Sequence, residues 1–298
     1  MKIISVGEIL WDVFDHGEYL GGAPFNFAVH AQRLGHDVSF VSAVGNDERG
    51  RRALARIAEL GLSPRFVQCI DGQPTGIASV SLDALGQPQF VIHRPAAYDF
   101  VSLDECAGIS SPEADWIYFG TLHQQGAKAR VVLDALIEAN PRAHRFYDVN
   151  LRPSSYDAPL VRDLLKRASV VKLNHEEAVS VAALLGQKTG SIEEFCRDNA
   201  KAFGWKAVVV THGAEGCALL ISKDYAEVPG YSIQVADTVG AGDGFAAAFL
   251  HGLSQGWPAV EIGDFANRVA ALIASRAGGA PAWSVDEALA LSAPSSRS

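Results

Sequence analysis

Strand-like and helix-like segments alternate along most of the 298-residue chain, and this order constrains the fold more than any other feature. Helix-like segments end at Gly35, Gly61 and Pro141, residues that commonly stop a helix. A repeated strand-then-helix order predicts an α/β fold, a doubly wound and mostly parallel sheet with helices on both faces. Short apolar runs indicate the strands, at residues 2–6, 37–45, 115–120, 144–150, 169–174 and 206–213. The helix-like segments between them cover residues 26–35, 47–61, 127–141, 158–168 and 175–186.

Polar residues follow several of these strands at the point where each strand is expected to end. Asp148, Asn150, Asn174, Glu177 and Gly213 all lie at or just after a predicted strand end. In open α/β sheets, ligands bind beyond the carboxyl ends of the strands. The sequence therefore places a candidate site at this edge of the sheet.

Residues 75–100 break the rhythm, because they alternate between apolar and polar residues around a Gly/Pro turn and so predict an antiparallel hairpin. Such an insertion can be a flap over a site or a simple edge extension of the main sheet, and the pattern leaves both open. The chain has no repeats or linker-like stretches. We expect one domain over residues 1–298, with a lid formed from about 12–22 and 72–98.

Composition excludes several classes of partner. The net charge of −9 and the pI of about 5.5 argue against nucleic acid, which normally requires a basic surface. No apolar stretch is long enough to span a bilayer, so no membrane association is expected. Cys69, Cys106, Cys196 and Cys217 form no C-x-x-C pair, which indicates ordinary thiols in a reducing cytoplasm.

The segment "DTVGAGDGFAAAFL", residues 237–250, has the glycine-rich turn and following helix that often hold a phosphate. It is not a P-loop, because no G-x-x-x-x-G-K-[ST] is present. Nor is it the dinucleotide fingerprint, because Phe245 stands where the third glycine is needed and the segment lies near the C-terminus. Both standard phosphate loops are therefore poor matches.

A third interpretation follows from the residues themselves. Gly240, Ala241 and Gly242 are small, so their N–H groups can approach a ligand closely, and a helix from about Asp243 onward would add the positive end of its dipole. Together these groups predict an anion hole. Asp243 could then be a general base that takes a proton from a substrate hydroxyl, or it could be the N-cap of the helix. The spacing leaves both roles open.

Two motifs far apart in the chain resemble one family. "DTVGAGDGF" is similar to the C-terminal signature of the PfkB, or ribokinase-like, sugar kinases, and "GGAPFNFAVHAQRLG", residues 21–35, is similar to the N-terminal signature. "KLNHEEA" resembles the N-x-x-E element of the family, and "VVTHGAEGC" resembles a strand and glycine turn of its nucleotide site. The resemblance covers nearly the whole chain and implies a ribokinase-like fold with a small antiparallel β lid.

The resemblance implies ATP-dependent phosphorylation of a sugar hydroxyl with Mg²⁺. Asp243 would be the base and residues 240–242 the anion hole. Asn174 and Glu177 would organise Mg²⁺ largely through water, which suits an ion that keeps much of its hydration shell. The alternative for this pair is a helix start, with Asn174 as N-cap and Glu177 three residues later.

The resemblance also names residues of the nucleotide site. Thr211, Gly213 and Gly216 match the wall around the ribose and phosphates, and Asn267 matches a position near the adenine. Asn267 could instead be an ordinary polar residue on a partly buried helix. The backbone carbonyls around Asp237 and in the "RAGGA" loop form a candidate site for a monovalent cation such as K⁺.

For the sugar, the resemblance points to residues near the start of the chain. Asp12 would accept hydrogen bonds from adjacent hydroxyls, Gly22 would let the backbone approach, and the Asn26 side chain could both donate and accept. The alternatives are a solvated loop acid for Asp12 and an N-cap for Asn26.

Two segments, "HRPAAYDF" and "DVNLRP", resemble the fructokinase branch and its ketose-acid relatives, as does the start "GEILWDVF". They contribute Arg94 at the end of the hairpin, and Asn150 and Arg152 after a strand. An arginine can read hydroxyls, phosphate or carboxylate, or can form a surface ion pair of little value. We expect Arg94 to matter more than Arg152, because a lid residue can close over substrate. The resemblance favours fructose, and leaves open 2-keto-3-deoxygluconate kinase and ribokinase or nucleoside kinase.

Two hypotheses lie outside this class. A catalytically inactive sugar-binding regulator is disfavoured, because a binding protein has no need of the base Asp243. A nicotinamide dehydrogenase is disfavoured by the missing G-x-G-x-x-G. The expected partners are a small sugar and ATP, and a homodimer through the lid is compatible with the resemblance.

Overall fold

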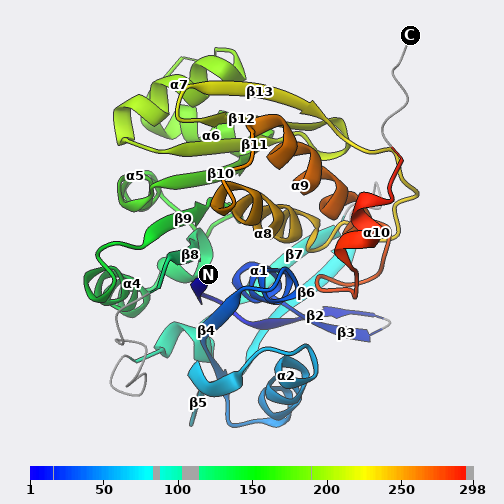
Figure 1. Cartoon of the computed structure of the whole chain (residues 1–298). Helices are drawn as coiled ribbons and strands as arrows, with labels where there is room; N and C mark the ends of the chain where they lie inside the picture. Colours follow the sequence, from blue (N-terminus) through cyan, green and yellow to red (C-terminus); the bar gives the residue numbers. More distant parts are fainter. Residues whose placement is uncertain (16, 83–87, 103–113, 189, 293–298) are drawn as a thin grey trace.

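The computed structural model describes residues 1–15, 17–82, 88–102, 114–188 and 190–292. Within these ranges the main sheet has the strand order β13-β12-β11-β10-β9-β8-β1-β4-β5 (Figure 1). Pairings from β5 across to β11 are parallel, whereas β11, β12 and β13 pair antiparallel at one edge, so the predicted mostly parallel sheet is confirmed. Its strands are β1 Lys2–Val6, β4 Asp37–Gly45, β5 Val67–Ile70, β8 Trp116–Gly120, β9 His144–Asp148, β10 Val170–Asn174, β11 Ala207–Thr211, β12 Gly216–Ile221 and β13 Asp224–Pro229.

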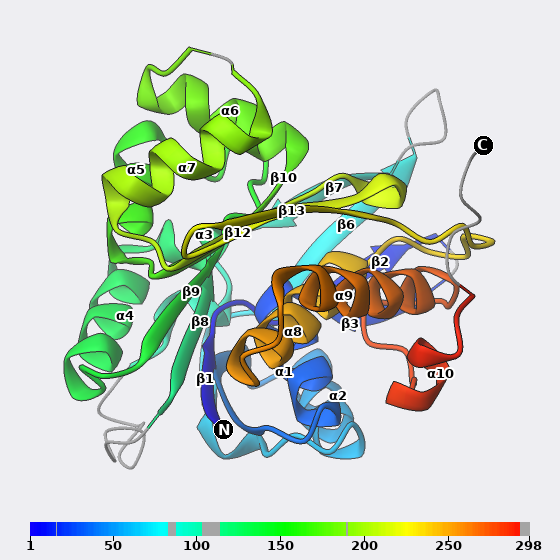
Figure 2. The same cartoon turned by 45° about the horizontal axis from the view of Figure 1, so that its top comes forward.

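Helices cover both faces of this sheet (Figure 2). One face packs against α1, α2, α8, α9 and α10, and the other packs against α4 to α7, which gives two separate apolar cores. The predicted helices are present within a few residues of their expected ends. The bounds are α1 Ala23–Arg33, α2 Glu48–Glu59, α3 Thr121–Gln124, α4 Ala127–Ala139, α5 Ala158–Arg167, α6 His175–Leu185, α7 Ile192–Phe203, α8 Ala241–Ser254, α9 Ala259–Ala274 and α10 Val285–Leu289.

The central strands are buried on both faces, which explains their unbroken apolar sequence. Every residue of β8 is buried, and Tyr118 in this strand stacks on Phe27 of α1 with ring centroids 3.6 Å apart. Phe146 of β9 meets the edge of the same Phe27 ring. This aromatic cluster fixes the first helix over the middle of the sheet.

A second, smaller sheet lies apart from the first, with the order β3-β2-β6-β7. The predicted hairpin is present as β6 and β7, but it pairs with β2 and not with the main sheet, so the edge-extension alternative is wrong. The sheet consists of two antiparallel hairpins joined by one parallel pairing of β2 with β6. The turn at 83–87, Cys106 and residues 293–298 lie outside the described residues. The strands are β2 Leu10–Phe14, β3 Gly17–Gly21, β6 Gly76–Leu82 and β7 Pro88–His93.

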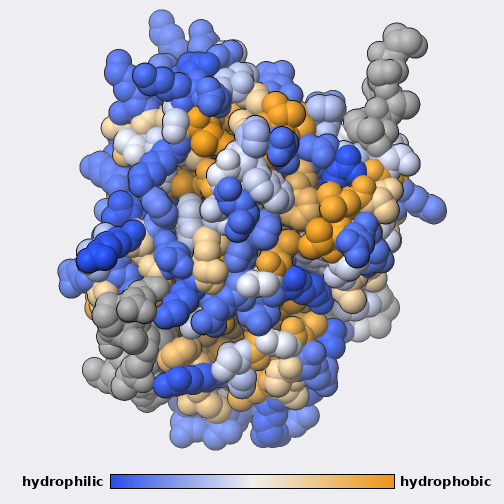
Figure 3. Space-filling model, viewed as in Figure 1, coloured by the Kyte–Doolittle hydropathy of each residue, from blue (hydrophilic) through white to orange (hydrophobic). Residues whose placement is uncertain are grey.

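The face seen in Figure 3 is mainly hydrophilic, with hydrophobic side chains gathered in the region of α9 and α10. Val260, Val285 and Leu289 are exposed hydrophobic residues of these two helices. Among the described helices, none combines the length and apolar character that a membrane span requires.

We expect Phe27→Ala to lower the free energy of unfolding by about 3–5 kcal/mol, because it removes a fully buried ring and leaves a cavity between α1 and the sheet. Urea denaturation followed by circular dichroism measures this. Val131→Ala, at an exposed position of α4, is the control and should change stability by less than about 0.5 kcal/mol. A cost below about 1 kcal/mol for Phe27→Ala would contradict an anchoring role for the stack.

Candidate active site

A cavity of about 730 Å³ opens beyond the carboxyl ends of β8, β9, β10 and β11 and extends to the second sheet. The second sheet contributes Leu10, Asp12, Ala78 and Ile92 to its wall. Most of the residues predicted from sequence line this one cavity, namely Asp12, Gly22, Asn26, Asn150, Arg152, Asn174, Glu177, Thr211, Gly240, Gly242 and Asp243. Residues from both ends of the chain therefore meet at the predicted edge of the sheet.

The glycine turn has the geometry of a ligand-binding helix start. Gly240 is in the left-handed region, with φ of 78°, and a Cβ there would stand 2.0 Å from the Gly279 carbonyl oxygen. The helix therefore begins at Ala241, and the expected start at Asp243 is wrong by two residues. Ala241 donates its N–H to the Thr238 carbonyl at 3.3 Å, whereas the Gly242 N–H has no partner among the described residues. One amide beside the cavity is thus free to bind an anion.

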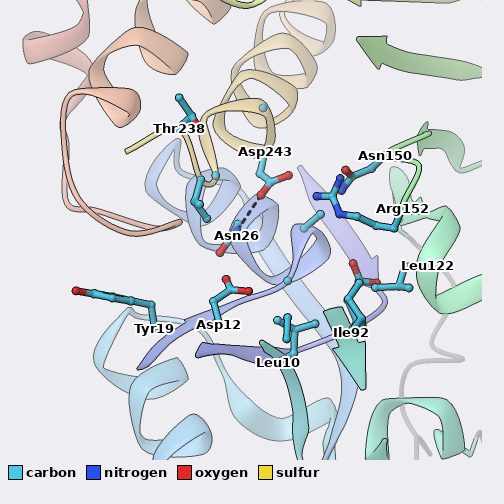
Figure 4. A pocket seen from close by; sticks show the side chains of 18 of the residues that line it. Leu10, Asp12, Tyr19, Asn26, Ile92, Leu122, Asn150, Arg152, Thr238 and Asp243 are labelled. Carbon is cyan, nitrogen blue, oxygen red and sulfur yellow. Dashed lines mark hydrogen bonds between the residues drawn. The ribbon is translucent and has the colours of Figure 1, made fainter. Parts of the chain in front are cut away.

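Asp243 is the third residue of α8 and is buried beside the cavity. The N-cap is Gly240, so the capping alternative for Asp243 is wrong. Its Oδ2 instead accepts a hydrogen bond of 2.8 Å from Asn26 Nδ2 (Figure 4). Burial, reinforced by the charge of Asp148, raises the pKa of Asp243 to about 6. A carboxylate with this pKa is ionised at neutral pH and still basic enough to take a proton.

Asn26 lies inside α1, so the N-cap alternative for this residue is also wrong. Its amide is 3% exposed, and its Oδ1 has no partner among the described residues. The Nδ2 group orients Asp243, and this contact between distant residues has no signal in the sequence. A contact of Asn26 with the sugar stays a prediction.

Two more carboxyl groups line the cavity near Asp243. Asp12 lies in β2 opposite Tyr19 and is buried, so it is not a solvated loop acid. Glu8, in the connection before β2, is 3% exposed, and its Oε2 has no partner in the described part of the chain. Burial raises the pKa of each group to about 7, and Arg152 opposes this only in part. In the sequence, Glu8 appears only as part of the "GE" pattern, which does not indicate a role for this residue.

The two predicted arginines lie in different surroundings, and a contact of either with substrate stays a prediction. Arg94 forms an ion pair with Asp99 and donates to the Leu122 carbonyl at 2.8 Å, and it does not line the cavity. Arg152 does line it and points toward Asp243 in Figure 4, beside Asn150. The geometry therefore favours Arg152 as the cation that meets a ligand.

A buried ion pair that carried no predicted role lies on the same wall. Lys172 Nζ contacts both carboxylate oxygens of Asp148, at 2.9 and 3.0 Å, and Tyr118 donates to Asp148 Oδ2 at 2.9 Å. Burial alone would lower the pKa of Lys172, but Asp148 and Glu177 outweigh it and raise that pKa. A lysine inside the apolar run "SVVKLN" was the signal, because a buried ammonium requires a partner.

Asn174 and Glu177 form a complete capping box at the start of α6. The Glu177 oxygens accept from the N–H groups of Asn174 and Leu151, both at 2.8 Å, and burial raises the pKa of Glu177. The capping alternative is thus present in the structure. Each oxygen can still accept a second hydrogen bond, and both residues line the cavity, so this pair fits a metal held through water better than direct coordination.

The predicted nucleotide residues divide into two groups. Thr211 lines the cavity, whereas Gly213, in the turn between β11 and β12, and Gly216, the first residue of β12, lie outside its lining. Asn267 donates from Nδ2 to the carbonyls of Val228 and Pro229, both at 3.1 Å, and so holds the end of β13. Contacts of the last three with a nucleotide stay predictions, as does Ala241 in the anion hole.

Asp237 joins the loop before α8 to the "RAGGA" loop. Its oxygens accept from the N–H groups of Val239 and Gly278, at 3.0 and 2.9 Å. This fixes the backbone around the predicted monovalent cation site, whose occupancy stays a prediction.

Comparisons with known proteins agree with this geometry. The family model described as "pfkB family carbohydrate kinase" matches residues 5–285. The chain is 29% identical to a fructokinase of Klebsiella pneumoniae over 266 residues, which is 85% of this chain and 84% of that protein. It resembles the crystal structure of a fructokinase from Xylella fastidiosa with bound ATP, with a TM-score of 0.85, 26% identity and 97% coverage of both chains.

A third likeness shows the fold alone. The 2-dehydro-3-deoxygluconokinase of Thermotoga maritima has a TM-score of 0.85, covers 97% of this chain and 98% of its own, and is 19% identical. These likenesses confirm the predicted ribokinase-like α/β fold.

We expect Glu8→Gln to raise the free energy of unfolding by about 1–3 kcal/mol at pH 8 and by much less near pH 4. In the unfolded chain Glu8 has its ordinary pKa of 4.5, whereas in the folded chain its pKa is about 7. The folded state therefore binds more protons in this window, and its stability falls as pH rises through it. Urea denaturation at several pH values measures the difference. Glu138→Gln, at an exposed position of α4, is the control. Equal effects of Glu8→Gln at both pH values would contradict a raised pKa of Glu8.

Proposed function

The chain belongs to the pfkB family of carbohydrate kinases, and on this premise we propose that it is a fructokinase that uses ATP and Mg²⁺. The observation that carries the proposal is the pairing of Asp243, whose pKa is raised to about 6, with the unpartnered Gly242 amide one residue before it. One group can accept a proton while the other stabilises negative charge on a phosphoryl group.

The proposed reaction moves one phosphoryl group and one proton. A primary hydroxyl of the sugar attacks the γ-phosphorus, the new P–O bond forms as the bond to the β-phosphate oxygen breaks, and ADP leaves. The hydroxyl proton passes to Asp243. Asn26 holds the Asp243 carboxylate in place at 2.8 Å, so that its other oxygen can face the sugar.

Magnesium, when bound, would supply positive charge that offsets the charge of the phosphates. On the protein side, Glu177 and Asn174 would bind its water ligands, since both line the cavity and are already fixed by their capping box. The cavity wall also contains more carboxyl groups than cationic side chains, which favours a cation beside the nucleotide.

The carboxyl groups that line the proposed sugar-binding part of the cavity favour a neutral ketose over a sugar acid as the substrate. Glu8, Asp12 and Asp243 are all less than 10% exposed. Among the described residues, two cationic side chains line the cavity, Arg152 and Lys172, and Lys172 is paired with Asp148. Carboxyl groups accept hydrogen bonds from adjacent hydroxyls of a polyol, whereas they repel a substrate carboxylate. The fructokinase relatives point the same way.

The substrate assignment is tested by a coupled ADP-release assay with fructose, ribose, adenosine and 2-keto-3-deoxygluconate. We expect kcat/KM for fructose to exceed each of the others roughly tenfold or more, because a site built to bind hydroxyls rejects analogues that leave its polar groups unpaired. A preference for the sugar acid would replace fructokinase by 2-keto-3-deoxygluconate kinase. Tight sugar binding without turnover would instead indicate a binding protein.

We expect Asp243→Asn to reduce kcat roughly 10²-fold or more, while the fold and sugar binding are retained, because the amide cannot accept the hydroxyl proton. In the unsubstituted enzyme, kcat/KM should fall as pH falls through about 6, where the Asp243 carboxylate takes up a proton. Initial rates between pH 5 and 8 measure this limb. Near-normal turnover of the variant would refute the base assignment.

A further inference from the structure

Lys172 is a buried cation beside the anion hole, and the mechanism above gives it no role. Its side chain lines the cavity and is 8% exposed. A Cβ atom added to Gly242 would lie 3.6 Å from Lys172 Nζ. A phosphoryl oxygen bound by the free Gly242 amide would therefore be within reach of the ammonium group.

The ammonium group is held in this position from behind. Two contacts, at 2.9 and 3.0 Å, join Nζ to the two oxygens of Asp148, and Tyr118 fixes Asp148 by a third hydrogen bond. An ammonium has three N–H donors, and these partners account for two of them. The remaining donor has no partner in the described part of the chain, so it can serve a ligand in the cavity.

The charged groups near Lys172 also favour a contact between its ammonium group and a phosphoryl oxygen. Asp243 and Glu177 line the cavity together with Lys172, act on its charge, and would repel an incoming triphosphate. A cation near these two groups offsets that repulsion at the place where charge develops during transfer. Unlike Arg152, Lys172 is carried on a central strand, so its Nζ needs no loop movement to reach the site.

We propose that Lys172 is a further catalytic residue, whose ammonium group contacts the transferring γ-phosphoryl group while Asp148 and Tyr118 hold it in position. Lys172 stays protonated throughout and moves no proton. The inference rests on the proposed phosphoryl transfer, but on neither the identity of the sugar nor the base assignment.

The test separates contact with the γ-phosphoryl group from simple pairing with Asp148. Lys172→Met removes the cation but leaves Asp148 buried without its partner, so it is compared with the double variant Asp148→Asn/Lys172→Met, which removes both charges. Lys201→Met, at an exposed position of α7, controls for the change in net charge. The readouts are thermal unfolding, kcat with the sugar, and the affinities for ATP and ADP by titration calorimetry.

We expect both Lys172 variants to lose roughly 10²-fold in kcat, the usual scale for one transition-state donor. ATP should bind roughly tenfold more weakly and ADP nearly as before, because only ATP carries the γ-phosphoryl group. The double variant should unfold near the temperature of the unsubstituted protein and remain slow. Recovery of kcat in the double variant, or equal loss of ATP and ADP affinity, would overturn the proposal. If the unsubstituted protein has no sugar turnover, the proposed function fails, and the ATP and ADP affinities still decide the role of Lys172.

Discussion

The hydrogen bond from Asn26 to Asp243 joins residues 217 positions apart, and the geometry of the site depends on it. It requires α1 and α8 to lie close together. Gly244 lies where α8 packs against two helices, because a Cβ there would stand 3.4 Å from His30 of α1 and 2.0 Å from a methyl carbon of Ile273 of α9.

Helix α1, which carries Asn26, also fixes the loop that packs against the glycine turn. Burial lowers the pKa of His30 to about 3, so the ring is neutral. Its Nδ1 accepts from Trp283 at 3.0 Å, which leaves Nε2 to donate to the Gly279 carbonyl at 3.1 Å. That carbonyl is the group against which Gly240 packs. Base and anion hole are therefore positioned by one helix, through two neutral hydrogen-bonding side chains.

Features formed by consecutive residues could be predicted from the sequence, whereas contacts between distant residues could not. The glycine turn and Asp243 were recognisable because their chemistry resides in consecutive residues, and the alternating segments were recognisable because strand and helix periods differ. Lys172 and Glu8 were not assigned a role, because a buried charge acquires meaning only from partners that folding brings to it, such as Asp148. Arg94 was preferred to Arg152 because the position of the hairpin over the sheet cannot be read from its own residues.

In the proposed reaction, the residues assigned to phosphoryl transfer and those assigned to the sugar lie on different parts of the structure. Asp243, Gly242 and Lys172 belong to elements of the main sheet and its helices, whose cores hold them rigidly. Asp12, Leu10 and Ile92 belong to the second sheet, which has only a small apolar cluster of its own. The neighbouring Trp11 and Ile77 of this sheet pack against the core of the main sheet, so substitutions at the cavity-lining positions change contacts with a ligand at little cost to that core. One phosphoryl-transfer site can therefore serve different sugars, and the second sheet and the loop that carries Arg152 are where the difference between a polyol and a sugar acid must be encoded.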